Sequence, residues 1–587
     1  APPRPRRARA LALASMPVPV LVGVGRLTQR PQSRLENALD PIGLAQAATA
    51  KALADAGVGP EVIQAVMFVE MLGEFRLPRK MIPAYDNPAL SLARRIGCPE
   101  AACYLSNVGG NQPQTCINIA SERIARGEID TCLVTGAEAI DTIARALKQK
   151  YDIVLDGSAQ TSDADKVLRW GDTTGVKPEL IGLATVVVNL HDLLHDVHEM
   201  PVAYSFLEQA VRRGDGVPIE DRTIGNARLF SGLSSVAAAS ENAAESWFPT
   251  ARSADEITQI TKDNRLVTNA YSKLNCAVMD VNQGASVLVM SDTKAAELGI
   301  PREKWVYLHG SADCEDIGVP LHAKPDLAEC PGMRFVGQEV FRTANVSRER
   351  IDFYDVYSCF PIAVRMACHE MNLPVDCESE ADRLTVIGGL PFHGGPGNNY
   401  VMHSIAAMVE KLRSRPGTFG LITANGGILS KHSAGIYSTV PYSETHPKHP
   451  AQWERGNCDP LLASAREATP PCEIARNPGG HEGRLIDVVI RYKAGSKPFS
   501  VTAMGELLTG PDAGKRFFAK SGDHETVMHI HRAGPDAMMG ELVSLNTIDI
   551  AGKGRGYQTT FHIKALENAS RTSGPGLVDS PAPAAKL

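Results

Sequence analysis

The sequence predicts an α/β protein made of two similar halves, followed by a smaller domain that is mostly β. Three observations support this fold class. From about residue 17, apolar β-prone runs alternate with helical segments, which is the pattern of a mostly parallel sheet covered on both faces. The alternation starts again near residue 300. From about residue 455 it gives way to β-prone runs broken by glycine turns.

The first half is predicted to span residues 17–295. The strand "VPVLVGVGR" is followed by the helix "DPIGLAQAATAKALADAG", the strand "VIQAVMFVEML" and the short capped helix "NPALSLARRIG". Residues 141–265 lose this rhythm and are predicted to form an inserted loop domain, after which the strand pattern returns at "ASVLVMSD". Gly23 and Gly25 match a dinucleotide-binding turn only weakly, because Thr28 stands where the fingerprint needs a third glycine. A tight strand-to-helix turn explains them without a cofactor.

The second half is predicted to span residues 296–445, and an additional β domain residues 455–566. In each half a strand ends in a glycine-rich turn that leads into a helix, which indicates a duplicated core. The number of strands in the last domain favours a small barrel of the OB type. The run "HETVMHIHRA" is predicted to be one of its strands, with His524, His529 and His531 alternating along it rather than binding a metal.

Composition excludes several classes of function. Hydrophobic residues at 43%, charged residues at 21% and a net charge of -6 describe an ordinary globular protein without the basic bias of a nucleic-acid-binding one. No run of apolar residues is long enough for a membrane span. The twelve cysteines form no metal-binding pairs and follow no secretory segment, so we expect free thiols, no metal and no secretion.

Both ends of the sequence carry possible targeting signals. Residues 1–16 are rich in Arg and Ala and are interpreted either as a transit peptide or as residues upstream of a start at Met16. Residues 567–587 are predicted to be a flexible tail that ends in Ala585, Lys586 and Leu587. This tripeptide differs by one small residue from the Ser-Lys-Leu peroxisomal signal. The expected location is therefore the peroxisome, and otherwise the cytoplasm.

One turn in the first half has the shape of a catalytic turn but no nucleophile. In "CYLSNVGGNQPQTC", a β-prone run enters a Val-Gly-Gly-Asn turn that leads into a helix, as in enzymes that place a reactive group at a helix N-terminus. Together with "NCAVMDVNQGASVLVMSD", "DVYSCFP", "GGLPFHGGPGNNY" and "GLITANGG", this block resembles the thiolase superfamily. The similarity covers residues 17–440 and is greatest to the sterol carrier protein thiolases and the thiolase-like proteins of type 1, which also have an extra C-terminal β domain.

The resemblance implies a five-layered α/β/α/β/α core, the binding of acyl-CoA and acyl transfer through an activated cysteine. The four positions that carry this chemistry in thiolases are all changed here. The nucleophile position is Val108, and the "HDCF" block begins at Tyr357. The histidine of the "GHP" turn is replaced by Gly395, and the "CxG" turn has become "TANGG", residues 423–427. Thiolase chemistry through residue 108 is therefore excluded, whereas binding of a CoA thioester is not.

Other residues in these turns are candidates for relocated chemistry. Cys359 could act as nucleophile or acid/base, with His393 or His432 as its partner. The alternatives are that Cys359 is a small buried hydrophobic residue and that His393 binds loop backbone. Five turn residues are predicted to bind the substrate, although the asparagines among them can instead hold the turns through backbone hydrogen bonds: Gly109, Gly110, Asn111, Asn398 and Asn425.

Two functions follow from these observations. The first is an acyltransferase that acts on CoA thioesters in lipid metabolism, with the CoA thioester as substrate and no separate cofactor. The second is a non-catalytic acyl-CoA-binding or scaffold protein that engages a protein partner through its C-terminal domain. The resemblance implies a homodimer formed through the sheet of the first half, or a monomer if the extra C-terminal domain covers that surface.

Overall fold

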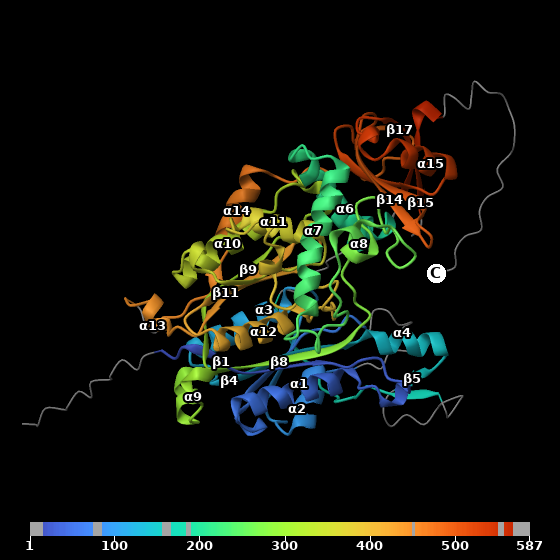
Figure 1. The fold of residues 1–587 in the computed structure, drawn as a ribbon. Helices are drawn as coiled ribbons and strands as arrows, with labels where there is room; N and C mark the ends of the chain where they lie inside the picture. The colour runs from blue at the N-terminus through green and yellow to red at the C-terminus, as the bar shows by residue number, and fades with distance from the viewer. Residues whose placement is uncertain are drawn as a thin grey trace, which may run out of the picture.

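The computed structural model describes residues 16–73, 85–154, 166–182, 189–448, 452–549 and 557–566. The leader and the terminal tripeptide that were considered above lie outside these ranges. The core has five layers, with helices outside and between two packed sheet regions, and a β barrel lies at one end of the molecule (Figure 1). The predicted fold class is confirmed, because the chain contains a large mixed sheet and a separate β-rich C-terminal unit.

The lower sheet region comes from the first half of the chain. Its strands, in spatial order, are β1 (Pro19–Thr28), β8 (Asn282–Ser291), β4 (Thr131–Ala139), β2 (Ala65–Phe68), β3 (Ala102–Ser106) and β7 (Glu179–Ile181). Helices α1 (Pro41–Ala56) and α2 (Pro88–Ile96) cover its outer face. Gly23 and Gly25 lie within β1, not in a turn, and a Cβ at either position would overlap the backbone of α1. These glycines therefore allow close helix–sheet packing.

The upper sheet region comes from the second half. Its strands are β9 (Val306–Glu315), β12 (Lys431–Ser438), β11 (Phe419–Gly426) and β10 (Phe353–Asp355), and the short β13 (Gly456–Asn457) pairs with β9. Helices α10 (Pro331–Ala344), α11 (Pro361–Glu370) and α14 (Asp459–Ala468) lie above it. A short antiparallel pairing of β1 with β9 joins the two regions. The short helices α9 (Asp292–Glu297) and α13 (Tyr442–Thr445) follow β8 and β12.

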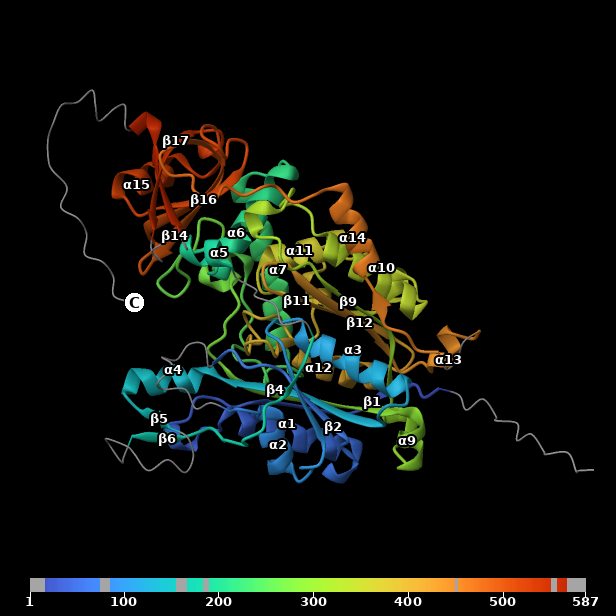
Figure 2. The same ribbon diagram turned by 180° about the vertical axis from the view of Figure 1, so that it is seen from behind.

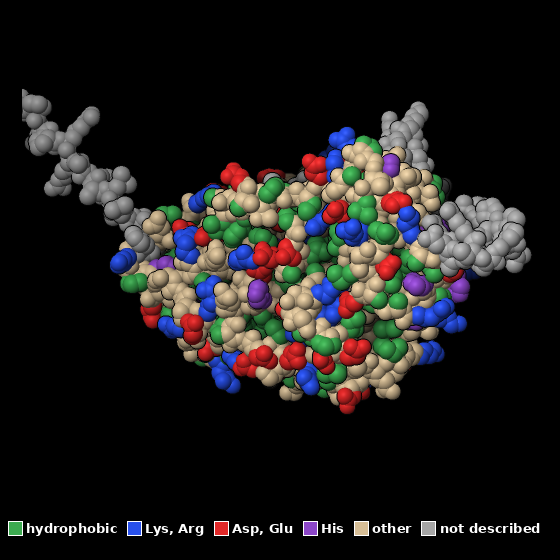
Figure 3. Space-filling model, turned by 90° about the horizontal axis from the view of Figure 1, so that it is seen from above, with side chains coloured by type: hydrophobic (Ala, Val, Ile, Leu, Met, Phe, Trp, Pro, Cys, Tyr) green, Lys and Arg blue, Asp and Glu red, His purple; other side chains and the backbone are tan. Residues whose placement is uncertain are grey.

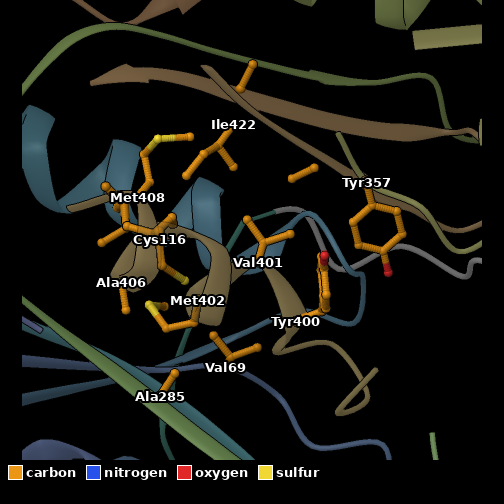
Figure 4. Close-up of a cluster of buried hydrophobic side chains, with 14 of the residues drawn as sticks. Val69, Cys116, Ala285, Tyr357, Tyr400, Val401, Met402, Ala406, Met408 and Ile422 are labelled. Atoms are coloured by element: carbon orange, nitrogen blue, oxygen red, sulfur yellow. The ribbon is translucent and has the colours of Figure 1, made fainter. Parts of the chain in front are cut away.

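The middle layer consists of α3 (Gln112–Ala125) and α12 (Tyr400–Ser414), which lie between the two sheet regions in both views (Figures 1 and 2). Figure 4 shows part of this interior, where Met402 and Met408 of α12 face Cys116 of α3 and Ile422 of β11. A helix that packs on two sheets must be apolar on most of its surface. The sequence of α12, "YVMHSIAAMVEKLRS", meets this requirement over its first ten residues, which are all buried, and Glu410 is the first exposed residue.

The inserted segment adds short strands and helices around this core. They are α4 (Ile140–Gln149), β5 (Asp152–Val154), β6 (Val167–Arg169), β7, α5 (Leu190–Leu194), α6 (Met200–Gly214), α7 (Ile219–Ala238) and α8 (Ala254–Thr258). Two of these elements matter for function. Strand β7 pairs in parallel with β3 and so covers an edge of the large sheet, and α6 packs between the core and the barrel.

The C-terminal unit is a closed barrel of β14 (Glu482–Lys493), β15 (Lys497–Leu507), β16 (Arg516–Ser521), β18 (Tyr557–Ile563) and β17 (Leu542–Asp549), in that spatial order. The predicted strand "HETVMHIHRA" is wrong, because it forms helix α15 (His524–Ala533). Asp523 caps this helix through the Thr526 amide, 2.8 Å away, and Val527 and Ile530 are buried at helical spacing. The helical spacing of these two apolar residues therefore predicts the structure of this segment better than the apparent alternation of its polar and apolar residues.

The surface carries charges of both signs. On the face in Figure 3, Lys and Arg side chains are interspersed with Asp and Glu.

Within the described ranges, none of the helices combines the length and the apolar composition that a bilayer crossing requires. The described residues also contain no group of three or more His, Cys, Asp or Glu side chains arranged to hold a metal ion.

Candidate functional site

The turn that lacks a nucleophile lies between β3 and α3. Gly109 has a φ of 153°, a backbone conformation that favours glycine. Its N–H donates a hydrogen bond to Oδ1 of Asn398, 3.0 Å away, and the carbonyl oxygen of Val108 accepts one from Nζ of Lys431 at 3.0 Å. The Gly109 amide, predicted to bind a thioester oxygen, is therefore already bonded within the protein.

The other predicted blocks meet this turn directly. A Cβ on Gly110 would overlap the hydroxyl of Tyr357 and would lie 2.5 Å from the carbonyl oxygen of Asn425. Tyr357 belongs to the "DVYSCFP" block and Asn425 to the "TANGG" turn, while Asn398 belongs to the "GGPGNNY" block. The structure thus brings together turns that are as much as 320 residues apart in the chain, as the resemblance implied.

Aromatic side chains fill the space beside these turns. Tyr204, on α6 of the inserted segment, donates a hydrogen bond to the Gly427 carbonyl at 3.0 Å and accepts one from Nδ2 of Asn425 at 2.8 Å. Its ring stacks on Phe360 with centroids 4.5 Å apart, and Tyr271 packs on the other side of Phe360 at 5.2 Å. Nothing in the sequence blocks indicated that the insertion would supply a side chain here.

A small cavity lies beside two of these turns. Its volume is about 10 Å³, and it is lined by residues that include Tyr357, Thr423, Asn425, His432 and Ser433. A volume of this size holds about one water molecule.

Cys359 lies against this aromatic cluster and has few features of a nucleophile. Its side chain is buried, and burial raises the pKa of the thiol to about 12, although hydrogen bonding to Tyr204 and Asn425 acts in the opposite direction. Helix α11 begins two residues later, as expected, but its N-terminus does not outweigh the loss of hydration. Unlike a catalytic thiol, Cys359 also forms no hydrogen bond to a histidine of the described residues that could accept its proton, so the geometry favours the interpretation of Cys359 as a small buried residue.

His393 lies in a different cluster. Its Nδ1 is 3.5 Å from Oγ of Ser246, and its ring packs at 5.2 Å from that of His403 and 6.0 Å from that of Tyr400. Burial, with smaller effects from nearby His403 and two arginines, holds the pKa of His393 well below its ordinary value. These contacts differ from those of Cys359, so the structure does not bring the two residues together as a catalytic pair.

His432 has a cysteine partner, but that partner is not Cys359. Its Nε2 lies 3.3 Å from Sγ of Cys330, the residue that precedes helix α10. Burial lowers the pKa of His432 to about 4, and the nearby Lys324 acts in the same direction. The sequence analysis missed Cys330. The signal that could have found it is the "CPG" run, which places a thiol directly before the proline of a helix start.

The asparagines hold the turns together. Besides its bond to Gly109, Asn398 donates from Nδ2 to the carbonyl oxygen of Glu70 at 2.8 Å. Asn111 donates from Nδ2 to Oγ1 of Thr115 at 3.1 Å, and Asn425 donates to Tyr204. All three are buried. Their contacts match the structural alternative considered for them, in which they form backbone and side-chain hydrogen bonds within the protein.

Larger cavities lie beside Cys330 and His432. One of about 280 Å³ lies between the loop before α10 and helix α14, and another of about 110 Å³ lies between that loop and α5 of the inserted segment. They share the wall formed by Asp316, Val319 and Lys324. Lys324 donates from Nζ to the carbonyl oxygen of Leu429 at 3.2 Å and forms no ion pair with any described residue.

Comparison with known proteins agrees with this geometry. No family model matches the chain. Over 93% of its length and 99% of the other chain, it is similar to a monomeric SCP2-thiolase-like protein type 1 from Mycobacterium smegmatis, with 29% identity and a TM-score of 0.71. It also resembles the Ltp2–ChsH2(DUF35) aldolase, with 15% identity over 72% of this chain and 98% of that one, and a TM-score of 0.51. An acetyl-CoA acetyltransferase from Syntrophomonas wolfei gives 17% identity, coverage of 72% and 100%, and a TM-score of 0.51.

The duplicated five-layered core and the convergence of the four turns define a protein with the thiolase-like fold. Within this class the chain is related to the SCP2 thiolases through its similarity to the thiolase-like protein of type 1. The resemblance inferred from the sequence blocks is thereby confirmed.

Proposed function

We propose that this chain binds CoA thioesters but does not carry out thiolysis at the thiolase position. One observation carries this proposal. The turn of residues 108–111 keeps its shape and its neighbours, yet Val108 has replaced the nucleophile and the hydroxyl of Tyr357 packs against Gly110. A valine side chain cannot accept an acyl group, so a covalent intermediate at this position is chemically impossible.

The two larger cavities are the proposed binding site. Their combined size lies in the range of roughly 300–1,000 Å³ that is typical of ligand sites. Their walls include apolar residues such as Phe335 and Leu462 together with Lys324, Arg334 and Arg466. The arginines are paired with carboxylates, which leaves Lys324 as the cation that can turn toward a phosphate. A long ligand with a thin apolar arm and acidic phosphates, as CoA is, matches this lining.

A non-catalytic role with a protein partner is the second candidate. We assign the C-terminal barrel to the OB type, because its strand order and the position of α15 between β16 and β17 support a five-stranded Greek-key barrel. It carries exposed apolar side chains at Phe499, Leu542 and Ile548, with exposed fractions of 37%, 41% and 56%. Exposed apolar residues on one small domain favour a docking role for it.

Calorimetric titration tests the proposed function. We expect CoA and acetoacetyl-CoA to bind, and we expect no thiolysis of acetoacetyl-CoA by free CoA. Lys324→Met should weaken binding about tenfold through loss of one phosphate contact, whereas Lys294→Met, on the surface helix α9, should leave it unchanged. Absence of CoA binding at millimolar concentration would refute the binding site, and rapid thiolysis would refute the assignment of Val108.

We also propose that the chain is monomeric. The resemblance implied dimer formation through the sheet of the first half, but β7 of the inserted segment pairs with β3 over residues 104–106. A strand edge that is already paired cannot form the same ladder with a second subunit. Sedimentation at micromolar concentration should give one species with the 62.9 kDa mass of the chain, and a stable dimer would contradict this reasoning.

A further inference from the structure

We propose that Cys330 and His432 form a thiol–imidazole pair that accepts an acyl group from a CoA thioester. This inference rests on the proposed function, because it requires the thioester to bind in the adjoining cavities. It differs from the chemistry expected from the sequence, in which Cys359 was the nucleophile. The arguments are the rigidity of the pair, its place at a helix start, its position near cavities and the chemistry of its two groups.

The backbone around Cys330 is firmly held. The residue is the N-cap of α10, and its carbonyl oxygen accepts hydrogen bonds from the amides of Met333 at 3.0 Å and Arg334 at 3.1 Å. Its own amide donates to Oε1 of Glu370 at 2.6 Å, and the other oxygen of Glu370 accepts from Nε of Arg334 at 2.7 Å. The thiol is therefore fixed at the start of a helix of 14 residues.

The imidazole comes from the opposite side, at the start of strand β12. His432 is the second residue of the strand, paired with Cys314 of β9, which fixes the position of its backbone. A Cβ on Gly332 would lie 3.1 Å from Cδ2 of His432, so a glycine in the first turn of α10 allows the ring to approach closely. The 3.3 Å distance between Sγ and Nε2 is within hydrogen-bonding range for sulfur. The other ring nitrogen, Nδ1, is buried and has no hydrogen-bond partner among the described residues.

Cavities lie near both members of the pair. His432 lines the 10 Å³ cavity beside two of the turns. Glu329 and Pro331, the chain neighbours of Cys330, line the 280 Å³ cavity, and Lys324 lines both of the larger cavities. A thioester at the inner end of the large cavity would therefore lie beside the thiol. Cys330 is only 2% exposed, so the thioester reaches its thiol only when side chains of the cavity wall such as Phe335 move aside, while the backbone of Cys330 stays in place.

Both groups are neutral at rest. Burial raises the pKa of Cys330 to about 11, against smaller opposing effects of Lys324 and the Met333 amide, while His432 has a pKa of about 4. A neutral imidazole can accept the thiol proton as the sulfur attacks. Lys324 and the N-terminus of α10 would stabilise the negative charge that forms. No ion pair in the ground state is needed for this step.

The reaction is a thioester exchange and needs no oxidant or second substrate. Sγ of Cys330 attacks the thioester carbonyl carbon while its proton passes to Nε2 of His432. The bond between the carbonyl carbon and the CoA sulfur then breaks. The CoA thiolate takes the proton from His432, which leaves acyl-Cys330, free CoA and a neutral imidazole. The N–H of Gly332, in the first helical turn, has no acceptor within the helix and can bind the transient oxyanion.

The decisive experiment is to incubate the full chain with acetyl-CoA and octanoyl-CoA and to locate acyl adducts by peptide mass spectrometry. We expect one adduct on the peptide that contains Cys330, removed by neutral hydroxylamine as a thioester should be. Cys330→Ala should abolish it. His432→Asn should slow its formation roughly a hundredfold, the typical contribution of a general base. Cys98→Ala is the matched control and should leave the rate unchanged, since Cys98 is also buried with a raised pKa but has no histidine partner among the described residues.

CoA binding by each variant, measured by calorimetry, separates the two proposals. No binding by the wild type would refute the proposed function. Binding without an adduct, or an adduct on Cys359, would refute the role of Cys330 alone. Should His432→Asn not fold, alkylation of wild-type Cys330 by iodoacetamide decides the question. If octanoyl-CoA slows alkylation of Cys330 at least fivefold relative to alkylation of Cys98, the result supports the thiol–imidazole pair. Equal alkylation rates of Cys330 with and without the thioester overturn the proposal.

Discussion

Acid should destabilise the α/β core through histidines that are buried in their neutral form, and His403 on α12 is the clearest case. Its side chain is fully buried, and both ring nitrogens lack hydrogen-bond partners among the described residues. Burial lowers its pKa to about 3, with smaller contributions from Arg26 and Lys51. In the unfolded chain a histidine has a pKa of about 6.5. The unfolded state therefore binds the additional proton as the pH falls below that value, and stability is lost.

The size of this effect can be derived for one residue. At pH 5 the unfolded imidazole is protonated and the folded one is not, so His403 lowers the free energy of unfolding by about 2 kcal/mol relative to pH 7.5. His403→Gln keeps a polar side chain but removes the titration. The loss of stability between pH 7.5 and pH 5 should thus be about 2 kcal/mol smaller in this variant than in the wild type.

Urea unfolding at the two pH values measures this difference. All four tryptophans, residues 170, 247, 305 and 453, lie outside the barrel, so tryptophan fluorescence reports the core alone. His524→Gln is the control, because His524 is exposed at the start of α15. If His403→Gln and the wild type lose the same free energy on acidification, the buried imidazole is not neutral in the folded protein and the reasoning fails.

Two further predictions concern packing. Gly110→Ala should lower the free energy of unfolding by about 2 kcal/mol or more, because the added methyl would overlap the Tyr357 hydroxyl and the Asn425 carbonyl. Gly214→Ala is the control and should stabilise α6 slightly, because the space around Gly214 is open. Urea midpoints measure both, and a neutral Gly110→Ala would contradict the tight contact between the turns. Arg213→Met should destabilise the junction of α6 and the barrel by roughly 3 kcal/mol, because it leaves the buried carboxylate of Asp487, 2.6 Å from the Arg213 guanidinium, without its cation. Burial raises the pKa of Asp487 to about 6, so the penalty should shrink at pH 5 as the carboxyl takes up a proton. Thermal unfolding of Arg213→Met at pH 7.5 and pH 5 measures this change, with Lys497→Met on the barrel surface as control. An equal loss of stability at the two pH values would contradict the role of the Asp487 carboxylate.

The fold and the position of the site could be predicted because they depend on local signals. Strand, glycine turn and helix follow one another around Val108. A strand and a helix flank Cys359, and a glycine turn joins β11 to β12 beside Asn425, so each turn was identifiable within about 20 residues of sequence. The partners within the site could not be predicted in this way. Tyr204 comes from an insertion without any recognisable block, and Cys330 and His432 are 102 residues apart in the chain. The last two meet because α10, which begins after Cys330, packs on the paired strands β9 and β12.

Whether a side chain in these turns is reactive also depends on its burial, which the sequence alone does not show. Cys359 precedes a helix, and that position alone favours a reactive thiol. Tyr204, Tyr271 and Phe360 surround it, however, and the resulting loss of hydration dominates. The same reasoning explains why His393 and Cys359 are not a pair, although both lie in turns that converge. A turn fixes where a backbone lies, whereas the direction of each side chain depends on what packs against it.

The turn without a nucleophile now has a physical explanation in the packing of the two halves. Its backbone receives one hydrogen bond from Lys431 and donates one to Asn398, both from the second half, and Gly110 packs against Tyr357 and Asn425 of that half. Loss of such a partner would lower the free energy of unfolding by about 1–3 kcal/mol for each buried backbone group. A change of residue 108 from cysteine to valine removes a reactive group but none of these contacts, whereas a change of Gly109 or Gly110 would disrupt them. The side chain of residue 108 is thus the replaceable part of the turn, and its glycines are the part that the fold requires.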